Sequence, residues 1–98
     1  MFRELNPILH SELRLAIMSI LISVESAEFT YIKKETAATS GNLSVQLDKL
    51  SQAGYITVKK GFKGKKPCTT CRITTEGIKA FREYVEAIKT YLDSGKQG

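Results

Sequence analysis

Five lysines lie close together between residues 59 and 66 of this 98-residue sequence. Gly61, Phe62 and Gly64 separate them, so the stretch combines high positive charge with a backbone that bends easily. Ammonium groups pair with phosphate oxygens without reading a base sequence. The cluster could therefore contact an anionic polymer, or it could simply keep a surface loop soluble. The lysines are Lys59, Lys60, Lys63, Lys65 and Lys66.

A second group of polar side chains precedes the lysines. Two of them, Asn42 and Gln46, are amides spaced four residues apart, which places them on one side of a helix. Such amides can pair with the N6 and N7 edge of adenine, and Val45 could contact a thymine methyl group. The alternative is an ordinary solvated helix face. The candidate residues for nucleic-acid contact in this segment are Ser40, Gly41, Asn42, Ser44, Val45, Gln46 and Lys49.

Cys68 and Cys71 form a C-x-x-C pair that invites a metal or redox interpretation. A structural zinc site needs about four ligands, and the sequence offers no further cysteine and only one histidine, His10. In a strand, residues three apart face opposite sides with Cα atoms about 10 Å apart, too far for a disulfide. A lone histidine also supports no nucleophile and base pair. We therefore expect no metal, no cofactor and no enzymatic activity.

Length and charge limit the class of protein. Ninety-eight residues suffice for one domain with a modest core. The net charge of +5 and the pI near 9.3 favour an acidic partner such as nucleic acid. The longest apolar run, residues 13–22, contains Arg14 and Ser19 and is too short to span a bilayer. The chain starts at Met1 without a cleavable leader, so we expect a cytoplasmic protein with no membrane partner.

Helical periodicity predicts three helices in the first half of the chain. Asn6 and Pro7 are typical of a helix start, and the first helix is apolar nearly all round. A second helix is expected over residues 29–39, with Thr30 as its cap. After a break at residues 39–41, a third helix covers residues 41–52. Its apolar stripe consists of Leu43, Leu47 and Leu50, and Gly54 can form its left-handed C-terminal cap.

The second half predicts a hairpin and a long helix. Residues 55–59 and 68–74 are β-rich, and the lysine cluster lies in the connection, a flap longer than a two-residue turn. Thr74 and Thr75 can cap a helix over residues 75–92. Apolar residues on that helix follow one another at spacings of 3, 4, 3 and 4, which is typical of a seam between two helices. These residues are Ile78, Phe81, Val85, Ile88 and Leu92.

The order of elements is helix, helix, helix, strand, basic flap, strand and long helix. Two helices with a short break form a helix-turn-helix, and a hairpin after them makes the winged variety, mainly α with a small β-hairpin. We expect one domain over residues 1–98, with a core at about 6–74, a dimerisation helix at about 75–92 and a flexible tail at 93–98. The third helix, 41–52, would enter the major groove, and the lysine-rich wing, 59–67, would follow the phosphate backbone.

A specific resemblance supports this fold. Residues 40–56, S-G-N-L-S-V-Q-L-D-K-L-S-Q-A-G-Y-I, resemble the recognition helix and first wing strand of winged-helix transcriptional regulators of the multiple-antibiotic-resistance (MarR) and arsenic-repressor (ArsR) types. A compact single-domain subgroup carries a G-x-K/R-P-x-T wing, then L/I-T-x-x-G and a long helix. The matching positions here are Gly64, Lys66, Pro67, Thr69, Ile73, Thr74 and Gly77.

The resemblance covers about residues 6–92 and implies a homodimeric transcriptional regulator that binds double-stranded operator DNA. By architectural analogy, a small-molecule effector could sit between the subunits. The alternative function is that of a winged-helix subunit that binds protein without specific DNA binding. The residues expected at the dimer interface are apolar and lie on the first and last helices: Leu15, Met18, Ile22, Val85, Ile88 and Leu92.

Overall fold

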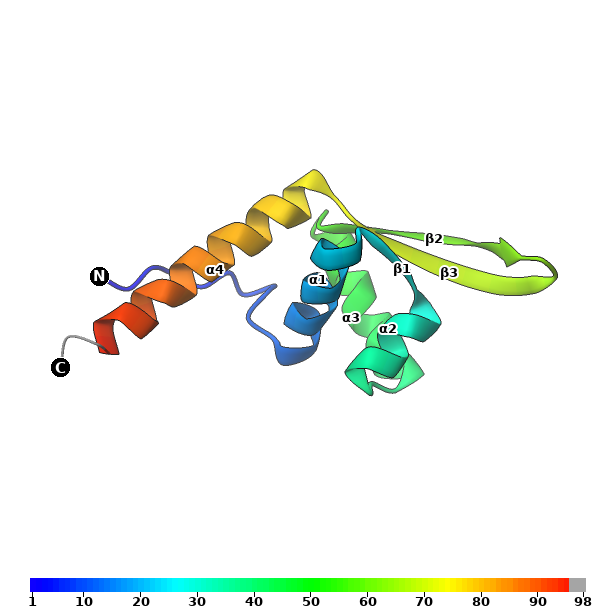
Figure 1. The fold of residues 1–98 in the computed structure, drawn as a ribbon, viewed down its shortest axis with the longest axis horizontal. Helices are drawn as coiled ribbons and strands as arrows, with labels where there is room; N and C mark the ends of the chain where they lie inside the picture. The colour runs from blue at the N-terminus through cyan, green and yellow to red at the C-terminus, as the bar shows by residue number, and fades with distance from the viewer. Residues whose placement is uncertain (96–98) are drawn as a thin grey trace.

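The structure is a computed structural model, and it describes residues 1–95. Three helices form the centre of the molecule, while a β-hairpin projects from them on one side and a long helix on the other (Figure 1). In chain order the elements are α1 (Glu12–Val24), β1 (Ser26–Glu28), α2 (Phe29–Thr36), α3 (Ser40–Gln52), β2 (Ile56–Lys63), β3 (Lys66–Ile73) and α4 (Thr75–Gly95). This is the winged helix-turn-helix that the order of elements predicts.

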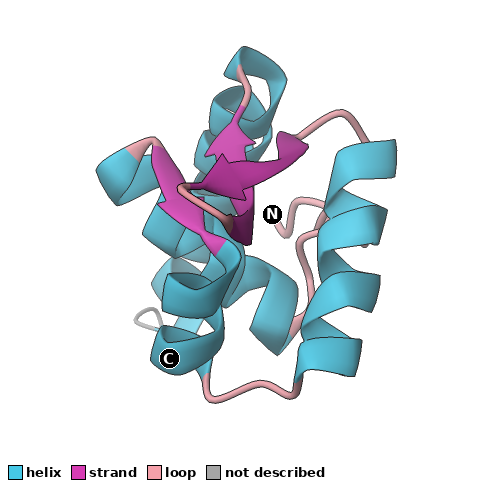
Figure 2. Ribbon diagram, turned by 90° about the vertical axis from the view of Figure 1, so that its right-hand side faces the viewer, coloured by secondary structure: helices cyan, strands magenta, loops and turns pink. Residues whose placement is uncertain are grey.

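The three strands form one antiparallel sheet in the order β1-β3-β2. The predicted hairpin corresponds to β2 and β3, whereas the sequence analysis missed β1. In this short strand, Ser26 pairs with Arg72 and Glu28 pairs with Thr70. β1 thereby ties the connection between α1 and α2 to the base of the hairpin. Viewed from the hairpin side, the strands stand in front of the helices (Figure 2).

The core lies between the three central helices and the base of the sheet. The apolar stripe predicted for α3 is confirmed, because Leu43, Leu47 and Leu50 are all buried. Met18 is buried as well, packed in the same cluster within its own chain. Its assignment to the dimer interface is therefore wrong. The periodicity of α1 marks several apolar faces, but it does not indicate which face packs inside the protomer.

The first helix begins later than the sequence predicted. Asn6 does act as a cap, but its Oδ1 accepts from the backbone N–H of Ile8 at 2.8 Å and closes a separate turn. α1 starts at Glu12, and the Ser11 hydroxyl accepts from the N–H of Arg14. Ser11 is the better cap because an acidic side chain follows it directly, at the positive end of the helix dipole.

The turn between α2 and α3 lies earlier than predicted. α2 begins at Phe29, with Glu28 rather than Thr30 in the N-cap position, and ends at Thr36. Ala37 then takes a left-handed conformation with φ of 57°. The Thr39 hydroxyl accepts from the N–H of Asn42 at 3.1 Å and starts α3 at the next residue. The break therefore covers residues 37–39 and not 39–41, because Thr39 supplies a side-chain cap.

The C-terminal end of α3 follows the prediction for Gly54. This glycine has φ of 82°, in the left-handed region that favours glycine. Its N–H donates to the Ser51 carbonyl, and the N–H of Tyr55 donates to the Leu50 carbonyl, each at 3.0 Å. The two bonds make a Schellman motif, which satisfies the last carbonyls of the helix and directs the chain into β2.

The predicted flap at residues 60–67 is wrong in its local structure. β2 and β3 continue through the lysine cluster and meet at a two-residue turn, Gly64 and Lys65. Gly64 has φ of 66°, which such tight turns require. Lysine has a low strand propensity, but both faces of this ribbon are in water and its backbone groups still pair across it.

α4 extends to Gly95, so residues 93–95 belong to the helix and not to the predicted tail; residues 96–98 lie outside the described part of the chain. The predicted cap is present, since Thr74 Oγ1 accepts from the N–H of Gly77 at 2.9 Å. The N-terminal segment runs beside the distal half of the helix (Figure 1). There Phe2 stacks on Tyr91, with ring centroids 4.8 Å apart.

Gly77 is expected to be essential for the junction between β2 and α4. A Cβ at this position would lie 2.1 Å from the Tyr55 carbonyl oxygen, a backbone atom that also accepts from the N–H of Thr74. Gly77→Ala should therefore lower the free energy of unfolding by about 1–3 kcal/mol, measured by urea denaturation. Gly41→Ala is the control, because a Cβ there meets no atom within 4 Å of the described chain. Equal stability of the two variants would contradict the close-contact argument.

Candidate nucleic-acid interface

The N-terminal half of α3 presents an exposed polar face. Burial of the leucine stripe turns the opposite side of the helix outward, and Val45 is 51% exposed there. Gln46 is the exception, because its side chain is half-buried. The exposed members of the predicted set are Ser40, Gly41, Asn42, Ser44, Val45 and Lys49.

The two amides of this face are linked to each other and to α1. Gln46 Nε2 donates to Asn42 Oδ1 at 3.0 Å. Gln46 Oε1 accepts from Arg14 Nη1, in a hydrogen bond of 2.5 Å. The sequence analysis gave no role to Arg14. The signal available there was a charged residue inside an otherwise apolar run, which indicates a side chain with a specific partner.

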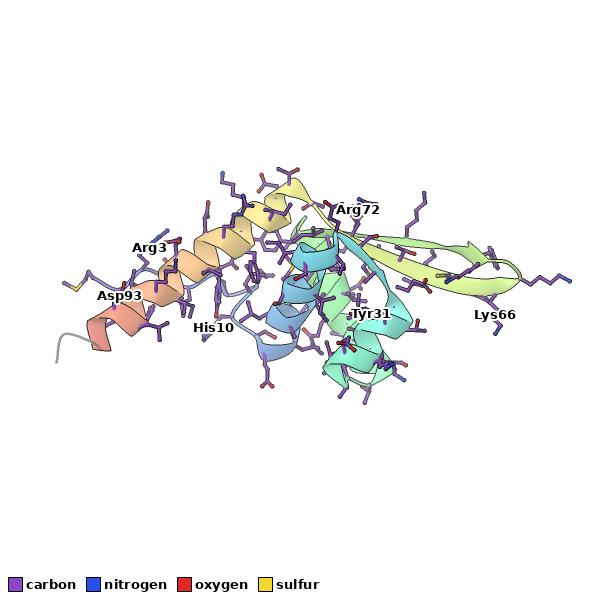
Figure 3. The ribbon with its side chains drawn as sticks, in the orientation of Figure 1. Arg3, His10, Tyr31, Lys66, Arg72 and Asp93 are labelled. Carbon is purple, nitrogen blue, oxygen red and sulfur yellow. The ribbon has the colours of Figure 1, made fainter. Side chains whose placement is uncertain are left out.

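The hairpin carries all five lysines of the cluster on exposed positions. Lys66 lies at the far end of the ribbon (Figure 3). Lys59 and Lys60 lie nearer the core, on the same strand as Lys63. A basic ribbon of this shape reaches well beyond the central helices, as expected of a wing.

Lys63 is engaged within the protein. Its Nζ lies 3.2 Å from Glu28 Oε2, and the Cys68 thiol donates to the other carboxylate oxygen at 3.3 Å. The hydrogen bonds from Lys63 and Cys68 hold the pKa of Glu28 below its ordinary value, so this carboxyl is ionised at neutral pH. The negative charge of Glu28 therefore partly neutralises Lys63, near the end of the wing.

Removing this carboxylate is expected to strengthen binding to nucleic acid. Glu28→Gln releases Lys63 to pair with a phosphate, so the slope of log affinity against log salt should steepen by up to about 0.9. Glu83→Gln removes the same charge from exposed α4 and is the matched control. Salt-dependent binding measurements that give the same slope for the two variants would show that Lys63 gains no phosphate contact.

The two cysteines lie in different surroundings. Cys71 is fully buried in the core, and burial raises the pKa of its thiol to about 11. It is therefore protonated at neutral pH, whereas Cys68 is half-buried beside Glu28. Among residues 1–95, no group of three or more metal-binding side chains comes together. Within the same range, no helix is both long enough and apolar enough to cross a membrane.

α4 divides its apolar residues between two faces. Ala80, Tyr84 and Ala87 are buried within the protomer, and Tyr84 Oη lies 2.9 Å from His10 Nδ1. The residues of the predicted seam are more exposed than this buried face, since the side chain of Leu92 is 63% exposed and that of Val85 is 37% exposed. The half-buried apolar residues of the seam and of α1 are Ile78, Phe81, Ile88, Leu15 and Ile22.

Comparisons with known proteins agree with this geometry. Residues 13–92 match the winged helix DNA-binding domain family. The chain is 35% identical over 81 residues to the protein MJ0432 of Methanocaldococcus jannaschii, covering 83% of this chain and 88% of that protein. A transcriptional regulator homologue of Pyrococcus horikoshii has the same fold, with a TM-score of 0.83 and 29% identity over 89% of this chain and 86% of the other.

A third structure adds a complex with DNA. The transcriptional regulator MOSR of M. tuberculosis, solved together with DNA, superimposes with a TM-score of 0.69. It is 14% identical, and the match covers 94% of this chain and 65% of that one. At this identity the likeness concerns the fold.

Proposed function

Since this chain belongs to the winged helix DNA-binding domain family, we propose that it regulates transcription by binding a two-fold-symmetric site on double-stranded DNA as a homodimer. The observation that carries the proposal is the pairing of an exposed polar face on α3 with a lysine-rich ribbon. The description of the Pyrococcus horikoshii protein as a transcriptional regulator homologue supports it.

In this proposal α3 enters the major groove with its N-terminal half. Asn42 is exposed, Gln46 is half-buried beside it, and both carry polar atoms that can contact base edges. Ser40, Ser44 and Lys49 flank them at exposed positions and would contact phosphates. The DNA complex of MOSR, a protein of the same fold, supports this use of the fold.

The ribbon formed by β2 and β3 would follow the phosphate backbone next to the groove. Lys65 and Lys66 are exposed at its end, so their charge is available to DNA. Lys63 would contribute less, since Glu28 already holds it. Contacts of this kind position the protein and add affinity on any sequence.

The dimer would form through α4 and α1, with residues 1–98 as a single domain. Leu92 and Val85 are exposed apolar residues on one side of α4, and Ile88 lies between them in the heptad pattern. A second copy of the same helix provides the complementary apolar surface. Two-fold symmetry would then set the two α3 helices about one turn of DNA apart.

Selection of bound sequences from random double-stranded DNA tests the proposal. We expect enrichment of an inverted repeat with half-sites spaced by about 10–10.5 base pairs, or by a multiple of that distance. The second candidate function is that of a winged-helix subunit that binds protein. Recovery of random sequences with no enriched half-site, or of no DNA at moderate salt, would favour that alternative.

A further inference from the structure

We propose that Arg14 determines the base preference of α3 by fixing the direction in which the Gln46 and Asn42 amides face. Arg14 then acts as a positioning residue, because its guanidinium contacts Gln46 and need not touch a base. The inference rests on the proposed function, in which this face of α3 lies in the major groove.

Arg14 is held in place by the turn that precedes α1. Its Nε donates to the Ile8 carbonyl at 2.6 Å, and its Nη2 lies 3.5 Å from the Pro7 carbonyl oxygen. The third contact, from Nη1, reaches across to Gln46 on α3. The side chain is half-buried, so its orientation is constrained by neighbours on several sides.

The chemistry of these groups leaves one arrangement. A guanidinium has donors and no acceptor, so the atom of Gln46 that faces Arg14 must be the amide oxygen. The amide nitrogen of Gln46 then points to Asn42. An amide nitrogen cannot accept, so Asn42 must turn its own oxygen toward Gln46 to receive that hydrogen bond. Each orientation follows from the donor-only character of Arg14.

Each amide oxygen thus accepts a hydrogen bond from the protein, and the amide hydrogens that remain free are donors. Gln46 Nε2 keeps a second hydrogen, and Asn42 is exposed, with no hydrogen bond from its Nδ2 to any other residue among 1–95. Guanine presents two acceptors in the major groove, O6 and N7, whereas adenine presents the N7 acceptor beside the N6 donor. The structure thus favours guanine, in place of the adenine contact expected from the sequence.

The first test replaces Arg14 with methionine and measures binding to four operators that differ only at the base pair that Asn42 and Gln46 contact. That base pair is the one at which Asn42→Ala and Gln46→Ala lose discrimination. For the wild type we expect guanine there to exceed adenine by roughly tenfold in affinity. In Arg14→Met both amides are free to rotate, so the ratio should fall to within about twofold. Arg72→Met, on β3, removes the same charge and should keep the wild-type ratio (Figure 3).

A second variant tests the inference without removing Arg14, so the contacts of Arg14 with the backbone are kept. Gln46→Glu leaves an oxygen for Arg14 but places another oxygen opposite Asn42. Asn42 must then donate inward and expose its oxygen, an acceptor. The preferred base should change from guanine to one with a donor at the same edge, adenine or cytosine. Thermal unfolding of each variant checks that it is folded.

The outcomes separate the inference from the function on which it rests. The role assigned to Arg14 is wrong if the wild type binds its operator but prefers adenine, or if Arg14→Met keeps the full preference. Either result leaves the proposed function as a DNA-binding regulator intact. The inference also fails if Gln46→Glu still prefers guanine. If the wild type selects no sequence at all, the proposed function itself fails.

Discussion

Replacing Ile88 and Leu92 by aspartate should convert the protein to monomers and weaken binding to a two-half-site operator by about 10²–10⁴-fold. Both residues belong to the heptad seam of α4, and Leu92 is 63% exposed in a single protomer. Aspartate places a charge where the partner helix would pack, and burying an unpaired charge is very unfavourable. Once the subunits separate, each α3 must bind its half-site alone. The affinity gained by linking two binding modules in one dimer is then lost.

Sedimentation and operator binding measure this effect together. The variant with Lys79→Gln and Arg82→Gln is the control, because it lowers the net charge by the same two units at exposed positions of α4. It should stay dimeric and lose only salt-sensitive affinity. The dimer proposal fails if the wild type already sediments as a monomer at tens of micromolar, or if the aspartate variant stays dimeric.

The parts of the fold that the sequence predicts correctly depend on local rules. The stripe of Leu43, Leu47 and Leu50 follows from helical periodicity alone, and all three are buried as expected. Gly54 and Thr74 close their helix ends as predicted, because caps need only the few residues around them. These features need no knowledge of distant contacts.

The parts that the sequence does not predict depend on contacts between distant segments. The three residues of β1 are too few for any alternation, and they form a strand only because β3 offers an edge to pair with. Met18 and Leu15 have equal claims to the core by periodicity, but only Met18 is buried there. Arg14 contacts Gln46 across 32 positions of the chain, a link that no local pattern contains.

The hairpin is a further part of the fold that the sequence does not predict. Composition favours a loose loop through the lysines, yet the register continues to the pair of Lys63 and Lys66 around a tight turn. Backbone pairing across the ribbon outweighs the low strand propensity of lysine. The functional consequence is a stiffer wing with its charges at defined positions, so single lysines should have distinguishable effects.

The wing and α3 should differ in how their mutations depend on salt. Lys65→Ala and Lys66→Ala should weaken binding to every sequence, and each should flatten the slope of log affinity against log salt by up to about 0.9. Lys63→Ala should flatten it less, because Glu28 already compensates that charge. The expected order among the three lysines tests the ion pair as well as the wing.

Mutations in α3 should leave the salt slope almost unchanged, because an amide contacts a base edge without releasing counterions. Asn42→Ala and Gln46→Ala should each cost about 1–3 kcal/mol on the preferred site for a lost contact to the base edge, and little on random DNA. Titrations of both kinds of DNA at several salt concentrations separate the two classes of variant on one protein. Wing variants that keep the full slope, or α3 variants that weaken specific and random binding equally, would show that these roles are assigned wrongly.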